Sequence, residues 1–200
     1  MDFVRELTNG IYSKMFNNYT NINLNNDITI FNISEVQNVE ENIKKALYYN
    51  LLNFCWEQIT NNKKKNENTF LVLDEAHLML DSRIKDTMIT LKTISKRCRK
   101  YNANLMIITH SLIDMLDDEL RKEGQGILEN SNYKILLGTD GRNLEESRDI
   151  FKLTEQELDI LASKKKGSGI FIAGSLKTPI NFKILKYEKE FVLGENRNGT

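Results

Sequence analysis

Two adjacent carboxylates follow an apolar run near the middle of the chain. The segment NTFLVLDEAHLML, residues 68–80, places Asp74 and Glu75 directly after that run. Charges at the end of a buried strand are costly unless a cation meets them. In nucleoside triphosphatases, an acid at this place holds Mg²⁺ and a second acid polarises the water that attacks the γ-phosphate. The pattern therefore predicts that Asp74 binds Mg²⁺ and that Glu75 is the catalytic base.

A structural explanation of the same residues is also open. Acids are favoured at helix N-termini, so the segment can be a strand end that leads into a helix. His77 follows the two acids, and a lone histidine there is expected to pack or to cap a helix.

A second apolar segment lies about 30 residues downstream. NLMIITHS, residues 104–111, ends in Thr109 and His110. If the two strands are neighbours in a RecA-like sheet, both polar residues emerge beside Glu75, where they can orient the attacking water and sense the γ-phosphate. A strand that simply ends in polar residues explains this segment equally well.

A cationic cluster precedes that strand. The segment KRCRKYN carries Arg97 and Arg99 between two lysines. A guanidinium group that projects from a subunit edge can stabilise transition-state charge in a neighbouring subunit, the role of an arginine finger. A solvated helix end is the alternative.

Elements that position these residues follow from the hydrophobic pattern. We expect a strand at 27–33, a helix from 36 onward, a polar connector at 61–68, a strand at 69–74, a helix at 82–102, a strand at 104–111, a strand at 132–138 and a helix around 143–150. Thr154 and Glu157 have capping-box spacing. Strands at 169–174 and 180–185, joined by a turn at 175–179, complete the chain. This order predicts an α/β fold with a mainly parallel sheet, helices on both faces and a C-terminal antiparallel strand pair.

Composition limits the class of protein. The 200 residues include 28 basic and 28 acidic side chains, so charge gives no reason to expect DNA. Cys55 and Cys98 are isolated, which is typical of reduced thiols and argues against a thiolate metal site. No window approaches the ~18 apolar residues of a transmembrane segment.

Five blocks in order carry a family resemblance: LVLDEAHLML, SKRCRKYNANLMIITHSLIDML, ILENSNYKILLG, FKLTEQELDIL and GSGIFIAGSLKTPINFKI. Together they resemble the carboxy-terminal part of the type IV secretion and conjugation ATPases of the HerA/FtsK superfamily, P-loop NTPases with a RecA-like fold. The segment at 7–36 is similar to the part that those proteins carry between their phosphate loop and their acidic strand.

The resemblance implies ATP and Mg²⁺ as cofactors, Asp74 and Glu75 as the acidic pair, and Arg97 or Arg99 as the finger. The family has Gln after Thr where this chain has His110. The chain also has no GxxxxGK[ST] motif, and KKKGSGIF at 164–171 is expected to be a turn before a strand. We therefore expect residues 1–187 to form the carboxy-terminal portion of a RecA-like ATPase domain without its phosphate loop, followed by a flexible tail at 188–200. Such a chain would not bind ATP tightly alone.

The family also implies a ring or dimer at the cytoplasmic face of a bacterial inner membrane. Its work there would be substrate transfer or channel assembly with other secretion components, and the substrate can be DNA or protein. A non-catalytic interaction module of such a machine is the main alternative. A DEAH-box helicase fragment is a weaker one, because too few residues follow His110 to build a second RecA-like domain.

Overall fold

The computed structural model describes residues 2–19, 22, 26–80 and 85–192, and it divides the chain into two compact units, residues 1–39 and 40–200. Unit 1 contains α1 (Asp2–Asn9), α2 (Ser13–Phe16) and the 3-10 helix η1 (Ser34–Asn38). The strand predicted at 27–33 is wrong, because this segment is irregular and pairs with no strand in the described chain. An extended segment becomes a strand only when its backbone groups find a ladder partner.

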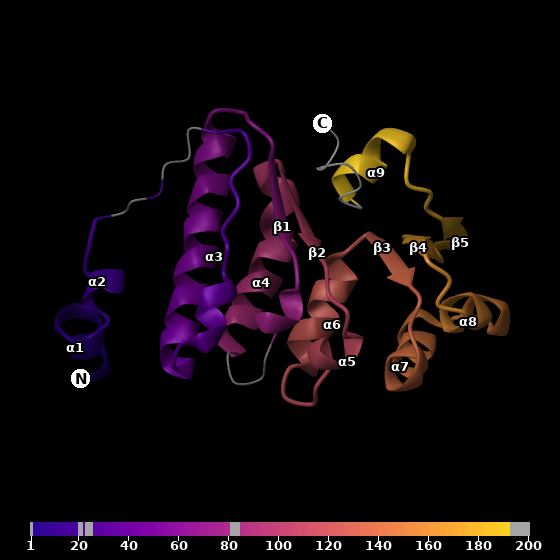
Figure 1. The fold of residues 1–200 in the computed structure, drawn as a ribbon, viewed down its shortest axis with the longest axis horizontal. Helices are drawn as coiled ribbons and strands as arrows, with labels where there is room; N and C mark the ends of the chain where they lie inside the picture. Colours follow the sequence, from indigo (N-terminus) through magenta and orange to yellow (C-terminus); the bar gives the residue numbers. More distant parts are fainter. Residues whose placement is uncertain (1, 20–21, 23–25, 81–84, 193–200) are drawn as a thin grey trace, which may run out of the picture. The chain divides into compact units, whose positions relative to one another are not determined.

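Unit 2 carries the remaining elements, shown in Figure 1. They are α3 (Glu41–Lys64), β1 (Thr69–Leu73), η2 (Ala76–Leu78), α4 (Lys85–Arg97), η4 (Cys98–Tyr101), β2 (Ala103–Ile107), α5 (Leu112–Met115), α6 (Arg121–Asn130), β3 (Tyr133–Leu137), α7 (Gly141–Phe151), α8 (Glu155–Ala162), β4 (Ser168–Ala173), β5 (Leu176–Asn181) and α9 (Lys186–Val192).

The predicted α/β fold class is confirmed, with the strands divided between two sheets. β1 and β2 pair in parallel, with Leu73 opposite Ile107. β3, β4 and β5 form an antiparallel sheet in that order, so the antiparallel part contains three strands and not the predicted two. The chain crosses from β1 to β2 through α4, as a parallel connection requires.

Several predicted boundaries move. α3 continues to Lys64, so the first half of the predicted connector at 61–68 is helical, as suits long straight side chains, and the left-handed Asn66 (φ 60°) follows its end. The last strand is Leu176–Asn181 and not 180–185, because the turn falls at Gly174 (φ 60°). Pro179 is tolerated within β5, since β5 is an edge strand.

Other helical expectations hold in part. The helix expected from 36 onward begins at Glu41, after η1. Of the helix expected at 82–102, residues 82–84 lie outside the described part of the chain, and α4 is described from Lys85. Thr154 and Glu157 form the predicted capping box on α8. The turn around Gly167 (φ 80°) leads into β4 and opens no helix, as expected for KKKGSGIF. α9 covers residues 186–192, which include the start of the expected tail, and residues 193–200 lie outside the described part. No helix among the described residues is long and apolar enough to span a membrane.

Two groups of buried side chains hold unit 2 together. α3 and α4 pack against each other and bury Tyr48, Leu52 and Leu91, while Leu73 is the most buried residue of β1. The second group centres on Leu161 and Ile170 and joins α8 to β4.

The expectation that helices cover both faces of the parallel sheet is wrong for the described residues. Phe70, Val72, Met106 and Ile108 alternate with more buried neighbours, and these four side chains are 43–59% exposed. They lie on one face of the β1–β2 pair, because alternate residues of a strand share a face. In the described part of unit 2, nothing buries that face.

Candidate functional site

The site lies just beyond the carboxyl ends of β1 and β2. The parallel ladder continues past both strands, since the Ile108 N–H donates to the Leu73 carbonyl (2.9 Å) and the Ala76 N–H donates to the Ile108 carbonyl (2.8 Å). The buried Ala76 therefore ties the turn after β1 to the end of β2. This pairing brings Glu75 and His110 together, as the sequence predicts for neighbouring strands.

Glu75 has an unusual backbone conformation. Its φ of 49° and ψ of 44° are left-handed, and its N–H donates to Asp74 Oδ1 at 3.0 Å. This conformation costs a non-glycine residue about 1–2 kcal/mol. Strain of this kind is often found at functional sites. The hydrogen bonds of Ala76 and Ile108 hold the turn in place against that cost.

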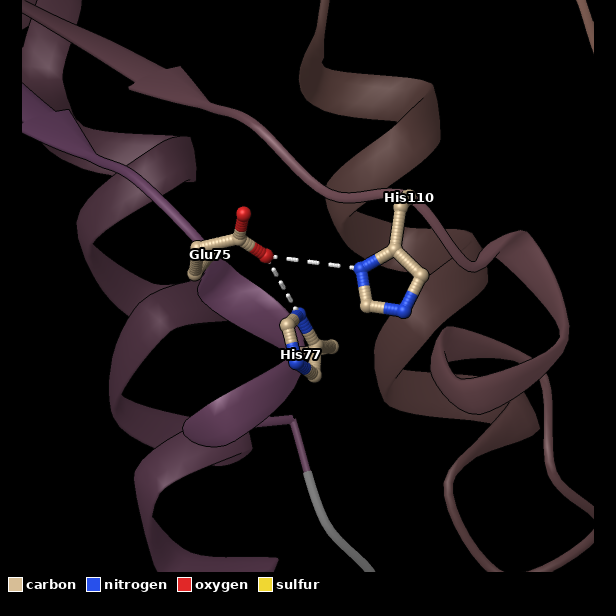
Figure 2. A group of neighbouring side chains, drawn as sticks. All are labelled: Glu75, His77 and His110. Atoms are coloured by element: carbon tan, nitrogen blue, oxygen red, sulfur yellow. Dashed lines mark ion pairs between the residues drawn. The ribbon is translucent and has the colours of Figure 1, made fainter. Parts of the chain in front are cut away.

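Glu75 meets two imidazole rings, as Figure 2 shows. Its Oε2 atom lies 3.2 Å from His77 Nδ1 and 3.4 Å from His110 Nδ1. The two rings are edge to face, with centroids 4.1 Å apart. The side chains of Glu75 and His110 are 60% and 68% exposed, whereas that of His77 is 22% exposed. One carboxylate oxygen therefore faces two imidazole nitrogens from two different turns.

His77 Nδ1 is buried and has no hydrogen-bond partner, although Glu75 Oε2 is near. The two observations agree if the 3.2 Å contact is an electrostatic one whose direction does not suit a hydrogen bond. A buried polar atom without a partner is unfavourable. It marks this imidazole nitrogen as one that a further group can use.

Asp74 and Thr109 have different surroundings. Asp74 is exposed, and its carboxylate suits Mg²⁺, which binds through one or two carboxylates while keeping water and phosphate oxygens. The Thr109 hydroxyl is used in a local turn, where it accepts from the Ser111 N–H (3.2 Å) and donates to the Ser111 carbonyl (3.3 Å). Thr109 thus shapes the segment that carries His110.

Arg97 and Arg99 lie away from this cluster. Arg97 ends α4, where its guanidinium carbon is 5.7 Å from the centre of the Trp56 ring, and Arg99 belongs to η4. Both precede β2, while Glu75 follows its parallel neighbour β1. Five strand residues span roughly 16 Å, so these arginines and Glu75 lie at opposite ends of the strand pair.

Sequence reasoning missed two contributors. The sequence predicts only a packing or capping role for His77, yet its Nδ1 faces Glu75. The available signal is that Glu75 and His77 are two residues apart after one strand, while the neighbouring strand is followed by a second histidine. Asn143 on α7 was not considered, and its Oδ1 accepts the N–H groups of Leu112 (3.0 Å) and Ile113 (3.2 Å). This contact anchors the start of α5, just after His110, and no local pattern predicts it.

Comparison with solved structures gives a clear match. The chain is similar to VirB4 of Thermoanaerobacter pseudethanolicus, with a TM-score of 0.84 and 32% sequence identity. The match covers 94% of this chain and 50% of that chain, so this chain spans about half the length of the solved relative. A scan against protein-family models and a search of curated proteins gave no match. The predicted resemblance to the ATPases of type IV secretion systems is confirmed.

Proposed function

We propose that this chain, which has the fold of about half of VirB4, is the carboxy-terminal ATPase segment of a type IV secretion or conjugation machine. The observation that carries the proposal is the parallel pairing of β1 and β2, which sets Asp74 and Glu75 beside His110. In open α/β sheets, ligands bind outside the carboxyl ends of the strands. The acidic pair lies at that end.

Each residue then has a distinct role. Asp74 would hold Mg²⁺, and the ion when bound would neutralise phosphate charge. Glu75 would accept a proton from the water that attacks the γ-phosphate, because its carboxylate is exposed and extends from a fixed turn. His110, 3.4 Å from Glu75, would orient that water in place of the family's Gln.

Arg97 or Arg99 would act on a neighbouring subunit. Their place at the opposite end of β2 keeps them from the site of their own chain, so a role as finger requires a second copy. We therefore propose that the protein forms a homo-oligomer, either a ring or a dimer. As the family resemblance of the sequence implies, the complete protein would work with other secretion components at the cytoplasmic face of a bacterial inner membrane.

Hydrolysis is best tested in a chimera. The matching half of Thermoanaerobacter pseudethanolicus VirB4 is replaced by this chain, and Mg²⁺-dependent ATP hydrolysis is measured for the parent chimera, Glu75→Gln and the control Glu67→Gln. Glu67 is exposed and precedes β1, at the end of that strand opposite to Glu75. We expect Glu75→Gln to lose about a hundredfold or more in rate. Equal rates for the parent and Glu75→Gln would contradict the proposed base.

The isolated chain provides a second test. Titration calorimetry with Mg²⁺ and ATP is expected to show no tight binding, because the printed sequence contains no GxxxxGK[ST] motif. Tight binding that weakens in Asp74→Asn would mean that the chain builds a phosphate site of another kind.

A non-catalytic docking module is the second candidate. The exposed apolar face formed by Phe70, Val72, Met106 and Ile108 favours it, since such a face suits protein contact. In that case Glu75→Gln would leave substrate transfer by the machine unchanged, whereas the ATPase proposal requires transfer to stop.

A further inference from the structure

We infer that Glu75, His77 and His110 form a binding site for a zinc-type transition metal ion, separate in its chemistry from the Mg²⁺ expected at Asp74. One oxygen and two imidazole nitrogens of these residues lie within 4.8 Å of one another. Imidazole suits Zn²⁺ and related ions, whereas Mg²⁺ prefers oxygen ligands. The donor set therefore selects a different metal from the one that ATP requires.

The distances fit a tetrahedral zinc site. Zinc bonds to histidine nitrogen and carboxylate oxygen are about 2.0–2.2 Å long, which places neighbouring donors of a tetrahedron about 3.3–3.5 Å apart. Glu75 Oε2 lies 3.2 Å from His77 Nδ1 and 3.4 Å from His110 Nδ1. Two edges of a coordination tetrahedron are thus already close to their bound length.

The buried nitrogen of His77 supports the same inference. It has no hydrogen-bond partner although it faces the cluster. Metal ligation would use this atom and remove the cost of leaving it unpaired. The left-handed turn at Glu75 is fixed by Ala76 and Ile108, so the carboxylate approaches the rings from a preset backbone. The ligands come from both strand ends, and binding would also join them.

Three protein ligands leave the fourth position of a tetrahedral ion for water. The exposure of His110 and Glu75 gives an ion a route in from solvent. Zinc would occupy Glu75 Oε2 and withdraw charge from the carboxylate, which would make Glu75 a weaker base. This inhibitory consequence rests on the proposed role of Glu75 in hydrolysis, whereas metal binding itself does not.

The test is titration calorimetry of this chain with Zn²⁺ alone, without nucleotide. We expect one ion per chain, no comparable heat with Mg²⁺, and at least about a tenfold loss of Zn²⁺ affinity in both His110→Gln and Glu75→Gln. Glu67→Gln is the matched control and is expected to bind like the parent. Circular dichroism of each variant checks that it remains folded; His110→Gln is the safer variant because His110 is 68% exposed.

Cobalt replacement tests the geometry. With one Co²⁺ per chain we expect the strong visible absorption of tetrahedral cobalt, lost in His110→Gln. Zn²⁺ affinity that is the same in the parent, His110→Gln and Glu75→Gln would overturn the inference, because residues outside the cluster would then hold the ion. No Zn²⁺ binding by the folded parent would overturn it as well. The result is independent of ATP hydrolysis, so failure here leaves the proposed function untouched.

Discussion

Replacing Glu75 by glycine and by alanine gives a test of the strained turn. Both variants lose the same carboxylate and the same contacts to His77 and His110, so those losses cancel in the comparison. Only the backbone preference at φ 49° then separates the two proteins. Alanine keeps the left-handed strain, and glycine releases it.

The expected magnitude follows from two opposing terms. Releasing the left-handed conformation stabilises the glycine variant by about 1–2 kcal/mol. The greater freedom of glycine in the unfolded chain offsets about 0.5–1 kcal/mol of that gain. The midpoints of these two ranges differ by about 0.75 kcal/mol, so we expect Glu75→Gly to be more stable than Glu75→Ala by about 0.5–1 kcal/mol. For a chain of this length the melting temperature would rise by about 1–4 °C.

Urea unfolding, followed through Trp56 fluorescence and circular dichroism, measures the difference, with a chelator present to exclude metal. Trp56 is half-buried beside Tyr101 and reports on unit 2. Glu57 is the control position, because it is exposed within the regular helix α3. There the alanine variant is expected to be the more stable by about 1 kcal/mol. If Glu75→Ala is as stable as Glu75→Gly, the strain argument is refuted.

Four other outcomes are expected. Thr154→Ala should destabilise the fold by about 1 kcal/mol, because Thr154 forms the capping box of α8; urea unfolding checks this. The same contacts lower the pKa of Glu157 in the folded chain. Their stabilisation is therefore present above the pKa of Glu157 in the unfolded chain and is lost as pH falls through the lower pKa of the folded chain. Unfolding of Glu157→Gln should not show this loss. Gly124→Ala should lower the free energy of unfolding by more than about 2 kcal/mol, because the added Cβ would lie 1.8 Å from the Met115 carbonyl oxygen. Thermal unfolding measures this loss of stability. Burial raises the pKa of Cys55 to about 11, so its alkylation, followed by mass spectrometry, should stay slow in the folded chain up to that pH and become fast on unfolding.

The fold class and the place of the site were accessible from sequence because their signals are local. Apolar runs that end in acids or in Thr109 and His110 predicted β1, β2 and the meeting of their ends. The spacing of Thr154 and Glu157 predicted a cap that the structure contains. These features depend on neighbouring residues and on one general rule, that parallel strands end at the same edge of a sheet.

The remaining features depend on partners far away in sequence. The segment at 27–33 has strand composition but no strand beside it in the described chain. The anchoring of Leu112 by Asn143 spans 31 residues, and no pattern at either residue indicates it. The left-handed Glu75 is equally hidden, because nothing in the letters DEAH distinguishes it from an ordinary turn residue.

The backbone conformation of Glu75 also helps to distinguish the two candidate functions. The other described non-glycine residues with positive φ all lie at or just after the end of a helix, where this conformation is common: Asn66, Asn102, Lys152 and Lys164. Glu75 instead joins a strand to a 3-10 turn and carries an exposed carboxylate. A docking module does not need an exposed acid in a strained backbone conformation, and glycine at position 75 would avoid the strain. An ATPase or a metal site needs the carboxylate in that position, so the strained turn favours chemistry at Glu75 over docking.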